Sequence, residues 1–207
     1  MRKKNFCIFA GSFYGGGAEK VSVNLANYLN KKKYDVTFLV FNKSGPYKKL
    51  LNKNVKIKVL KKNSKFFAFI KLISFLKDNK FDYFISSMRT TNIVTGLAAY
   101  FCNFNGKIIF REPNTLDGLK LNKFFTRKLY TYLMIISYFK ASGIIANSKD
   151  TLEDLFEYKI INKKKKTFLK GNPLITKKKY YFKKKNNFIA LSVGRLEYQK
   201  NFTFLIK

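Results

Sequence analysis

The chain contains no histidine and only two cysteines, Cys7 and Cys102. Zinc is held in proteins mainly by clusters of histidine and cysteine, and neither cysteine has a second ligand at a metal-binding spacing. A zinc site is therefore not expected. Both cysteines lie inside apolar runs, which predicts reduced thiols in the core of a cytoplasmic protein rather than a disulfide framework.

Long hydrophobic runs are also missing. The longest later run, residues 130–139, is much shorter than the ~20 residues that a membrane-spanning helix needs. The basic residues 1–4 precede an apolar run that breaks at Gly11, which is too short for a secretory signal. With 207 residues and 46% hydrophobic content, the chain can build one full domain and part of another. We therefore expect a cytoplasmic protein without a membrane span.

Acidic residues are scarce, because 11 Asp and Glu face 43 Lys and Arg, for a net charge of +32. Such a charge suggests nucleic acid or an anionic membrane face as a partner. The abundance of Lys, Asn, Phe, Ile and Tyr is also typical of an AT-rich coding sequence, which places much of the lysine on a solvated surface. The lysines are scattered and no RNA or DNA module signature is present, so no specific nucleic acid is expected.

Arginine is rare in this lysine-rich chain, and its positions are therefore informative. Arg89, Arg111 and Arg195 each follow a predicted strand. In open α/β sheets, ligands bind outside the carboxyl ends of the strands. Arginine suits bidentate contacts to phosphate or carboxylate, so we expect at least one of these side chains to contact a ligand.

A glycine-rich stretch, residues 11–19, follows a predicted buried strand at residues 5–10 and precedes a segment with helical spacing. Strand, glycine turn and helix start together favour a phosphate-bearing ligand, although a tight turn alone would also explain them. The stretch lacks the Gly-Lys-Ser/Thr ending of a P-loop. A dinucleotide fingerprint would need glycine in place of Lys20 and an acid in place of Asn42, so NAD binding is disfavoured.

Strand-like and helix-like segments alternate along the chain. Strands are predicted at residues 5–10, 34–41, 55–59, 81–86, 107–110, 143–146, 167–169 and 188–193, and helices at about 21–29, 66–76, 92–101 and 122–140, with one more after a cap at 147–148. This alternation predicts an α/β fold, with a Rossmann-like, mostly parallel sheet and helices on both faces. Helix 122–140 is apolar with basic flanks, and it fits either a core-covering helix or an interfacial membrane contact.

The composition changes after residue 172. Residues 173–187 are rich in lysine and lack periodicity, which predicts a linker between an N-terminal domain at 1–172 and a new segment at 188–207. A strand and half a helix cannot bury their faces alone. We therefore expect residues 188–207 to begin a second α/β domain that is truncated.

Four motifs in this order resemble glycosyltransferase family 4, whose members are retaining enzymes of the GT-B fold. They are Gly-Gly-Gly-Ala-Glu at residues 15–19, Gly-Ile-Ile-Ala-Asn-Ser at 143–148, Gly-Asn-Pro at 171–173, and Ser-Val-Gly-Arg-Leu at 192–196 with Gln-Lys-Asn at 199–201. Each motif is short, but their order and spacing extend over essentially the whole chain.

The resemblance implies two facing Rossmann-like domains with the substrates in the cleft between them. A nucleotide-sugar donor, expected to be UDP-linked, would lie mostly on the second domain. At matching positions, Arg195 and Lys200 would hold the donor diphosphate, and two fixed cations there would offset charge on the leaving group. Gly15, Gly16 and Gly17 would face the donor across the cleft. No metal or cofactor is implied, because the Asp-x-Asp metal site of the other major glycosyltransferase fold has no counterpart here.

On the acceptor side, Glu19 would begin the first helix, and Arg89, Arg111 and Glu112 would line the site. The implied acceptor is a glycan or lipid-linked glycan of the surface-polysaccharide or lipopolysaccharide type. The basic face and helix 122–140 would suit peripheral docking at the inner face of the cytoplasmic membrane.

The resemblance is incomplete in two respects, of which the first is that some relatives place a histidine in the acceptor domain, whereas this chain has none. Second, the pair of glutamates that contacts the donor in this family would lie beyond Lys207, so we name no catalytic residue and expect residues 1–207 alone to transfer no sugar. Two alternatives stay open, namely an inactive truncated remnant and a basic protein that binds nucleic acid or a membrane surface.

Overall fold

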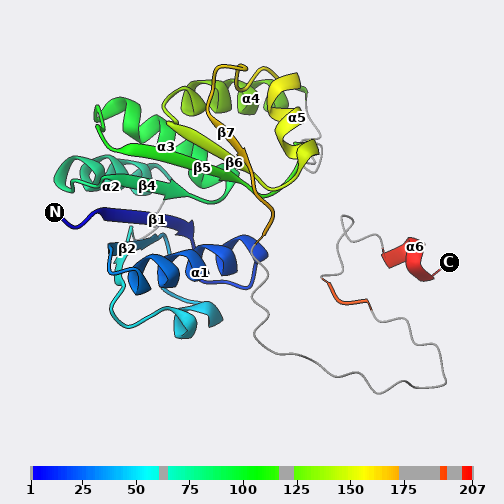
Figure 1. The fold of residues 1–207 in the computed structure, drawn as a ribbon. Coiled ribbons are helices and arrows are strands. Elements are labelled where there is room, and N and C mark those ends of the chain that lie inside the picture. The colour runs from blue at the N-terminus through cyan, green and yellow to red at the C-terminus, as the bar shows by residue number, and fades with distance from the viewer. Residues whose placement is uncertain (1, 61–64, 117–123, 173–191, 195–201, 207) are drawn as a thin grey trace, which may run out of the picture. The chain divides into compact units, whose positions relative to one another are not determined.

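The structure is a computed structural model that describes residues 2–60, 65–116, 124–172, 192–194 and 202–206 (Figure 1). The chain divides into two compact units, Met1–Asn172 and Pro173–Lys207. The first unit contains the sheet, and in the second the described helix is α6. The predicted linker and most of the predicted strand after it lie outside the described residues.

Strands and helices alternate through the first unit. Their bounds are β1 Asn5–Gly11, α1 Gly17–Lys31, β2 Asp35–Val40, the 3-10 helix η1 Pro46–Leu50, β3 Lys56–Val59, α2 Lys65–Asp78, β4 Tyr83–Ser86, α3 Arg89–Phe101, β5 Lys107–Glu112, α4 Phe124–Phe139, β6 Gly143–Ala146, α5 Lys149–Glu157 and β7 Thr167–Leu169, and α6 is Phe202–Ile206. Each predicted strand up to residue 169 is present, and the predicted α/β class with a parallel sheet is confirmed.

Within the described residues, seven strands form one parallel sheet in the order β3-β2-β1-β4-β5-β6-β7. The chain builds outward from β1 to β3 and then returns to place β4 on the other side of β1. Strand order therefore reverses between β1 and β4. In open α/β sheets a crevice forms outside the carboxyl ends of the strands at such a reversal, and ligands bind there.

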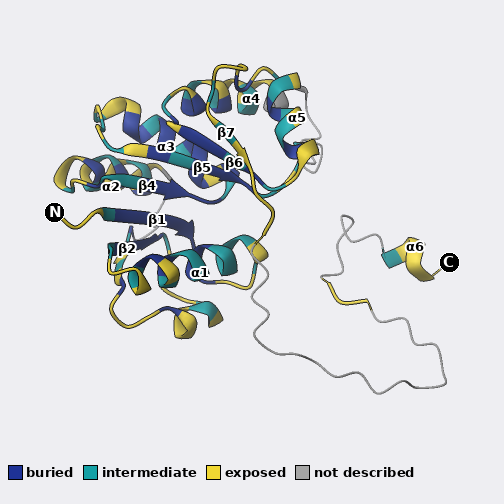
Figure 2. Cartoon of the chain, viewed as in Figure 1, coloured by how far each residue is buried: buried dark blue, intermediate teal, exposed yellow. Residues whose placement is uncertain are grey.

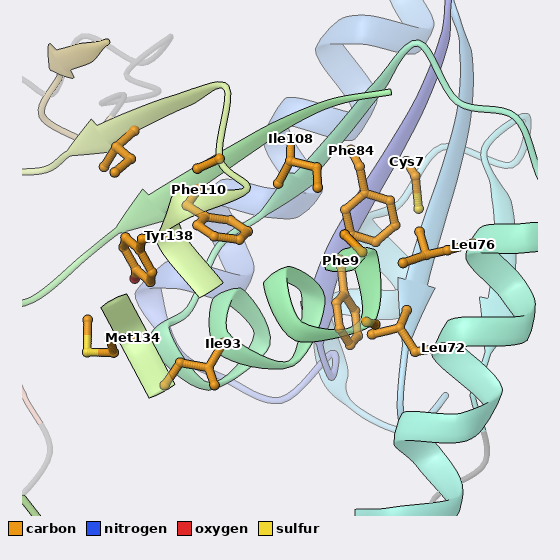
Figure 3. Packing of buried hydrophobic residues seen from close by; sticks show 14 of the residues in the cluster. Cys7, Phe9, Leu72, Leu76, Phe84, Ile93, Ile108, Phe110, Met134 and Tyr138 are labelled. Carbon is orange, nitrogen blue, oxygen red and sulfur yellow. The ribbon is translucent and has the colours of Figure 1, made fainter. Parts of the chain in front are cut away.

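Alternate residues of the strands bury two separate cores. On one face, Phe9 and Phe84 pack with α2, α3 and α4, and Figure 3 shows Leu72, Ile93 and Met134 of these helices in the same cluster. On the other face, residues of β1 and β2 pack against α1. In Figure 2 the central strands are largely buried, whereas the edge strand β7 and the outer helix surfaces are largely exposed. The sheet is thus held from both sides, so the residues at its carboxyl edge stand on a rigid base.

Helix α4 has two different sides. Met134 and Tyr138 are fully buried, and the helix packs against α3. Leu129, Tyr132 and Phe139 are exposed on the same helix. The core-covering role predicted for this segment is confirmed, and an exposed apolar surface remains beside it.

Two local predictions differ from the structure. Strand β5 continues to Glu112, because Arg111 and Glu112 pair with Ile145 and Ala146 of β6. Arg111 therefore lies in the strand, and its prediction as a residue after the strand was wrong. Helix α3 begins at Arg89, earlier than predicted, because Thr91 bonds back to the main chain of the residue before the helix.

Cys7 and Cys102 are both free thiols, and Cys7 is buried. Burial raises the pKa of the Cys7 thiol well above its ordinary value. Among the described residues, no helix is long and apolar enough to cross a bilayer.

Candidate functional site

The glycine-rich stretch at residues 11–19, the glycine loop, lies at the carboxyl end of β1, beside the reversal of strand order. Added Cβ atoms at Gly15 or Gly17 would meet nothing within 4 Å, so the space next to both residues is open. The first main-chain N–H groups of α1 have no partners within the helix, which is a general property of helix starts. The loop can therefore present N–H donors and positive helix-end charge to an anion.

Gly16 has a different environment from the other two glycines. A Cβ atom there would lie 2.0 Å from a carboxylate oxygen of Glu19, so the Glu19 side chain folds back over the loop. Glu19 stands in the first turn of α1, where a carboxylate interacts favourably with the helix dipole. This position accounts for Glu19 without a ligand.

A buried ion pair joins the start of α3 to the end of β5. Arg89 Nε donates to Glu112 Oε2 at 3.1 Å, and the two side chains are 9% and 0% exposed. Arg89 Nη2 also donates to the carbonyl oxygen of Asn114 at 2.7 Å. Arg89 is thus fixed by a carboxylate and by the loop that follows β5.

Two further side chains donate to Glu112. Asn92 Nδ2 lies 2.7 Å from Glu112 Oε1, and the hydroxyl of Tyr138 on α4 donates to the same oxygen. Burial raises the pKa of Glu112 above its ordinary value, while Arg89, Tyr138 and Asn92 act in the opposite direction. For Tyr138, burial raises the pKa, and the nearby Glu112 carboxylate raises it further. This network ties α3, β5 and α4 together beneath the carboxyl edge of the sheet.

Arg111 stands next to Glu112 but in a different environment. Its side chain is 6% exposed, and Nη2 donates to Asn172 Oδ1. Within the described part of the chain, Arg111 forms no ion pair, and its buried Nη1 has no hydrogen-bond partner. Burial lowers the pKa of this guanidinium, and Glu112 raises it by a smaller amount.

Other buried polar atoms without partners lie at the same edge of the sheet. Among the described residues, Ser87 Oγ after β4 and Asn147 Oδ1 after β6 also have none, and elsewhere the same holds for buried oxygens of Asn5, Asn92 and Thr95. Buried polar groups are usually hydrogen-bonded, so such a group in a native structure requires a specific reason. Unpaired polar atoms next to three neighbouring strands mark this edge as a place where a polar ligand could supply the missing bonds.

The loop after β5 is held at both ends. Arg89 binds the carbonyl of Asn114, and the main-chain N–H of Leu116 donates to Asp154 Oδ2 on α5 at 2.5 Å. Asp154 is therefore a second carboxylate that positions this loop. The loop borders the carboxyl edge, so these contacts help to define the shape of the site.

The structure pairs Arg89 with Glu112 and places Arg111 next to Glu112 in β5 with a separate partner, Asn172, whereas the glycine loop follows β1. Arg195 and Lys200 lie outside the described residues. Sequence reasoning missed Ser87, Asn92, Tyr138 and Asp154 as parts of this edge. Asn147 and Asn172 were within motifs already singled out, but nothing in the local sequence pointed to the contacts of Tyr138.

The described residues contain no group of three or more His, Cys, Asp or Glu side chains that could hold a metal ion. The side chains described at this edge carry guanidinium, carboxylate, amide and hydroxyl groups. Groups of these kinds can hydrogen-bond an anionic or hydroxyl-rich ligand.

The chain is similar to known proteins in sequence and in fold. A family model described as Glycosyltransferase Family 4 matches residues 15–168. A relative from Campylobacter jejuni subsp. jejuni serotype O:2, GalNAc-alpha-(1->4)-GalNAc-alpha-(1->3)-diNAcBac-PP-undecaprenol alpha-1,4-N-acetyl-D-galactosaminyltransferase, is 29% identical over 219 residues. That alignment covers 100% of this chain and 56% of the relative.

Two solved structures share the fold. The apo lipopolysaccharide outer core galactosyltransferase WaaB has 18% identity and a TM-score of 0.60, over 82% of this chain and 46% of that one. HepE from Anabaena in complex with UDP has 15% identity and a TM-score of 0.63, over 82% of this chain and 44% of HepE. The chain spans about half the length of these proteins. Because the family model matches well over half of its residues, the chain belongs to Glycosyltransferase Family 4.

Proposed function

We propose that this chain is the acceptor-binding part of a retaining glycosyltransferase that moves a sugar from a UDP-sugar to a glycan or lipid-linked glycan. The main observation in support is the row of buried, unpaired polar atoms at the carboxyl edge, on Ser87, Arg111 and Asn147. Family membership supports glycosyl transfer as the class of reaction, and the Campylobacter jejuni relative is named for transfer to a glycan on a lipid diphosphate.

In the proposed reaction, the bond between the sugar C1 atom and the UDP oxygen breaks, and a bond forms between C1 and an acceptor hydroxyl oxygen. The acceptor hydroxyl loses its proton, and UDP leaves with the electron pair of the broken bond. No cofactor or metal is proposed. We propose Arg195 and Lys200 for the donor diphosphate, Gly15, Gly16 and Gly17 for the side of the donor that faces the loop, and the edge near Arg111 for the acceptor.

The chain itself contributes binding and orientation. The Arg89–Glu112 pair fixes the loop after β5, and the glycine loop offers main-chain donors next to open space. Holding two reactants in a productive geometry accounts for a large share of enzymatic rate enhancement. The residues that act at the reacting carbon are not proposed from this part of the protein.

A transfer assay tests the proposal. The complete protein that carries this chain is incubated with radiolabelled UDP-sugars and lipid-linked glycan fractions, and the product is analysed for label and for anomeric configuration. We expect label on the glycan with the configuration of the donor retained. Inverted product would contradict the retaining assignment, and no transfer from any UDP-sugar would contradict the proposed reaction. We expect residues 1–207 alone to give no turnover above a blank.

We also propose that the protein works in the cytoplasm, peripherally at the inner face of the membrane. The exposed Leu129, Tyr132 and Phe139 of α4 and the excess of lysine support this placement. Flotation with liposomes should show binding that rises with anionic lipid and falls with salt. Equal binding to neutral vesicles would argue against it.

The alternatives can be separated from this proposal by the same preparations. A basic protein that binds nucleic acid should bind any sequence with a steep salt dependence, which would reflect charge alone. An inactive remnant should be trimmed by protease to about residue 173, whereas a stable full-length species would argue against that reading.

A further inference from the structure

The two arginines at the carboxyl edge of the sheet differ in what balances their charge. Arg89 is paired with Glu112 at 3.1 Å. Arg111 is equally buried, but its described partner is the neutral amide oxygen of Asn172. Side chains of successive strand residues point to opposite faces of the sheet, so Arg111 and Glu112 diverge although they are neighbours in β5.

Two guanidinium groups therefore accompany one carboxylate, and that carboxylate is already engaged by Arg89, Asn92 and Tyr138. A buried charge is costly unless it is paired and hydrogen-bonded. If Glu112 paired with Arg111 instead, Arg89 would be the buried charge without a partner, and the energetic cost would be the same. The remaining positive charge and the unpaired Nη1 atom of Arg111 call for an anion that the described residues do not supply.

We propose that Arg111 Nη1 binds a phosphate group of the acceptor substrate, with Ser87 and Asn147 as neighbouring polar groups. The inference rests on the proposed function, because it assigns the acceptor to the class of glycans linked to a lipid phosphate or diphosphate. Guanidinium groups bind phosphate oxygens through charge-assisted hydrogen bonds. Asn172, by accepting from Nη2, orients the guanidinium and leaves Nη1 for the ligand.

The sheet order distinguishes this phosphate from that of the donor. Strand β4 separates β5 from β1, so Arg111 is two strand positions away from the start of the glycine loop. Neighbouring strands are ~4.8 Å apart, which places the two strand ends about 10 Å from each other. A donor diphosphate at the glycine loop and an acceptor phosphate at Arg111 would thus occupy separate positions.

Binding measurements on the 207-residue chain test the proposal without requiring sugar transfer. The probes are inorganic diphosphate, geranyl diphosphate, UDP and glucuronate, each titrated by calorimetry into the wild type and into Arg111→Gln. The matched control is Lys107→Gln, which removes an equal charge from the exposed opposite end of β5. We expect Arg111→Gln to weaken binding of both non-nucleotide diphosphates at least tenfold, and Lys107→Gln to leave it within about twofold, since a charge-assisted contact to phosphate is lost in the first case only.

Stability measurements keep the test valid if a variant folds poorly. Without added anion, we expect Arg111→Gln to unfold at the same or a higher denaturant concentration than the wild type, because it removes an unpaired buried charge. Diphosphate should stabilise the wild type and Lys107→Gln but not Arg111→Gln.

Three results of the binding measurements would overturn the proposal. They are unchanged diphosphate binding by Arg111→Gln, an effect of this substitution on UDP alone, and tighter binding of glucuronate than of diphosphate. A strong loss of stability in Arg111→Gln without anion would also count against it, because it would make Arg111 a structural residue. Any of these results would leave the transfer reaction to be judged by its own assay.

Discussion

Arg89 Nε lies 3.1 Å from Glu112 Oε2, and this pair connects the first residue of α3 with the last residue of β5. The two residues are 23 positions apart in the sequence. Their contact fixes the relative positions of two elements whose ends form the candidate site. Several consequences for stability can be measured on the chain itself.

Removal of the cation from this pair should destabilise the fold. In Arg89→Met, the stem volume is largely kept, but Glu112 stays buried without its charged partner and Asn114 loses a donor. Breaking a buried ion pair in this way costs about 3–5 kcal/mol of unfolding free energy, measured by urea denaturation. Lys149→Met is the control, because its pair with Glu153 is exposed and should contribute below ~0.5 kcal/mol. Equal losses in both variants would contradict the role of the buried pair.

The effect of Arg89→Met should depend on pH. Burial raises the pKa of Glu112 above its ordinary value of 4.5, and Arg89 opposes this rise. Without Arg89 the pKa of Glu112 in the folded chain rises further. The folded chain then binds more protons than the unfolded chain over a wider pH range, and the free energy of unfolding falls as the pH increases through that range. The loss of unfolding free energy in Arg89→Met relative to the wild type, here called the deficit, should be smaller near pH ~4.5 and larger near pH ~8 because of this linkage. A deficit that is constant or shrinks with rising pH would contradict this account.

The hydroxyl of Tyr138 should contribute more than that of another tyrosine on the same helix. Tyr138 is fully buried and donates to Glu112, whereas Tyr132 is 61% exposed. Tyr138→Phe should lose roughly 1.5–3 kcal/mol of unfolding free energy, as expected for a buried hydrogen bond to a charged group. Tyr132→Phe should stay within about 0.5 kcal/mol, as is usual for surface positions. If both variants match the wild type, the bond to Glu112 does not stabilise the fold.

Substitution by alanine should affect stability at Gly96 and ligand binding at Gly15. At Gly96 a Cβ atom would lie 2.4 Å from the main-chain oxygen of Ser137, so alanine would push α3 away from α4. Overpacking of this kind costs typically 1–3 kcal/mol. At Gly15 nothing lies within 4 Å, so Gly15→Ala should fold normally and instead weaken donor binding in the complete protein. Thermal unfolding of both variants measures the effect on stability, and UDP titration measures the effect on donor binding. A Gly96→Ala variant as stable as the wild type would show that α3 and α4 can separate at low cost.

Local patterns were sufficient to predict most of the elements. The apolar run in β1, the alternation in β3 and the Ser148 cap of α5 each have a short-range physical cause, and Ser148 Oγ accepts the N–H of Thr151 as such a cap should. Predictions failed where pairing overrode local pattern. Strand β5 extends through two charged residues because β6 offers matching main-chain partners.

The contacts of the site could not be predicted in this way. Arginine at strand ends was an informative signal because lysine dominates the chain, and it identified Arg89 and Arg111 together. Only the order of strands and the positions of α3 and α4 determine that Arg89 receives the carboxylate while Arg111 does not. Tyr138 meets Asn92 across 46 positions of sequence, and no periodicity within either helix encodes that meeting.

The most direct test of the account is the rate of sugar transfer from a UDP-sugar to a lipid-linked glycan by the complete protein, measured for the wild type, Arg111→Gln and Lys107→Gln. The account predicts transfer by the wild type and by Lys107→Gln, and a rise in acceptor KM of tenfold or more, about 1.4 kcal/mol, in Arg111→Gln with little change for the donor. Absence of transfer in the wild type would contradict the proposed function. Equal acceptor KM values in all three proteins would contradict the role of Arg111 at the acceptor.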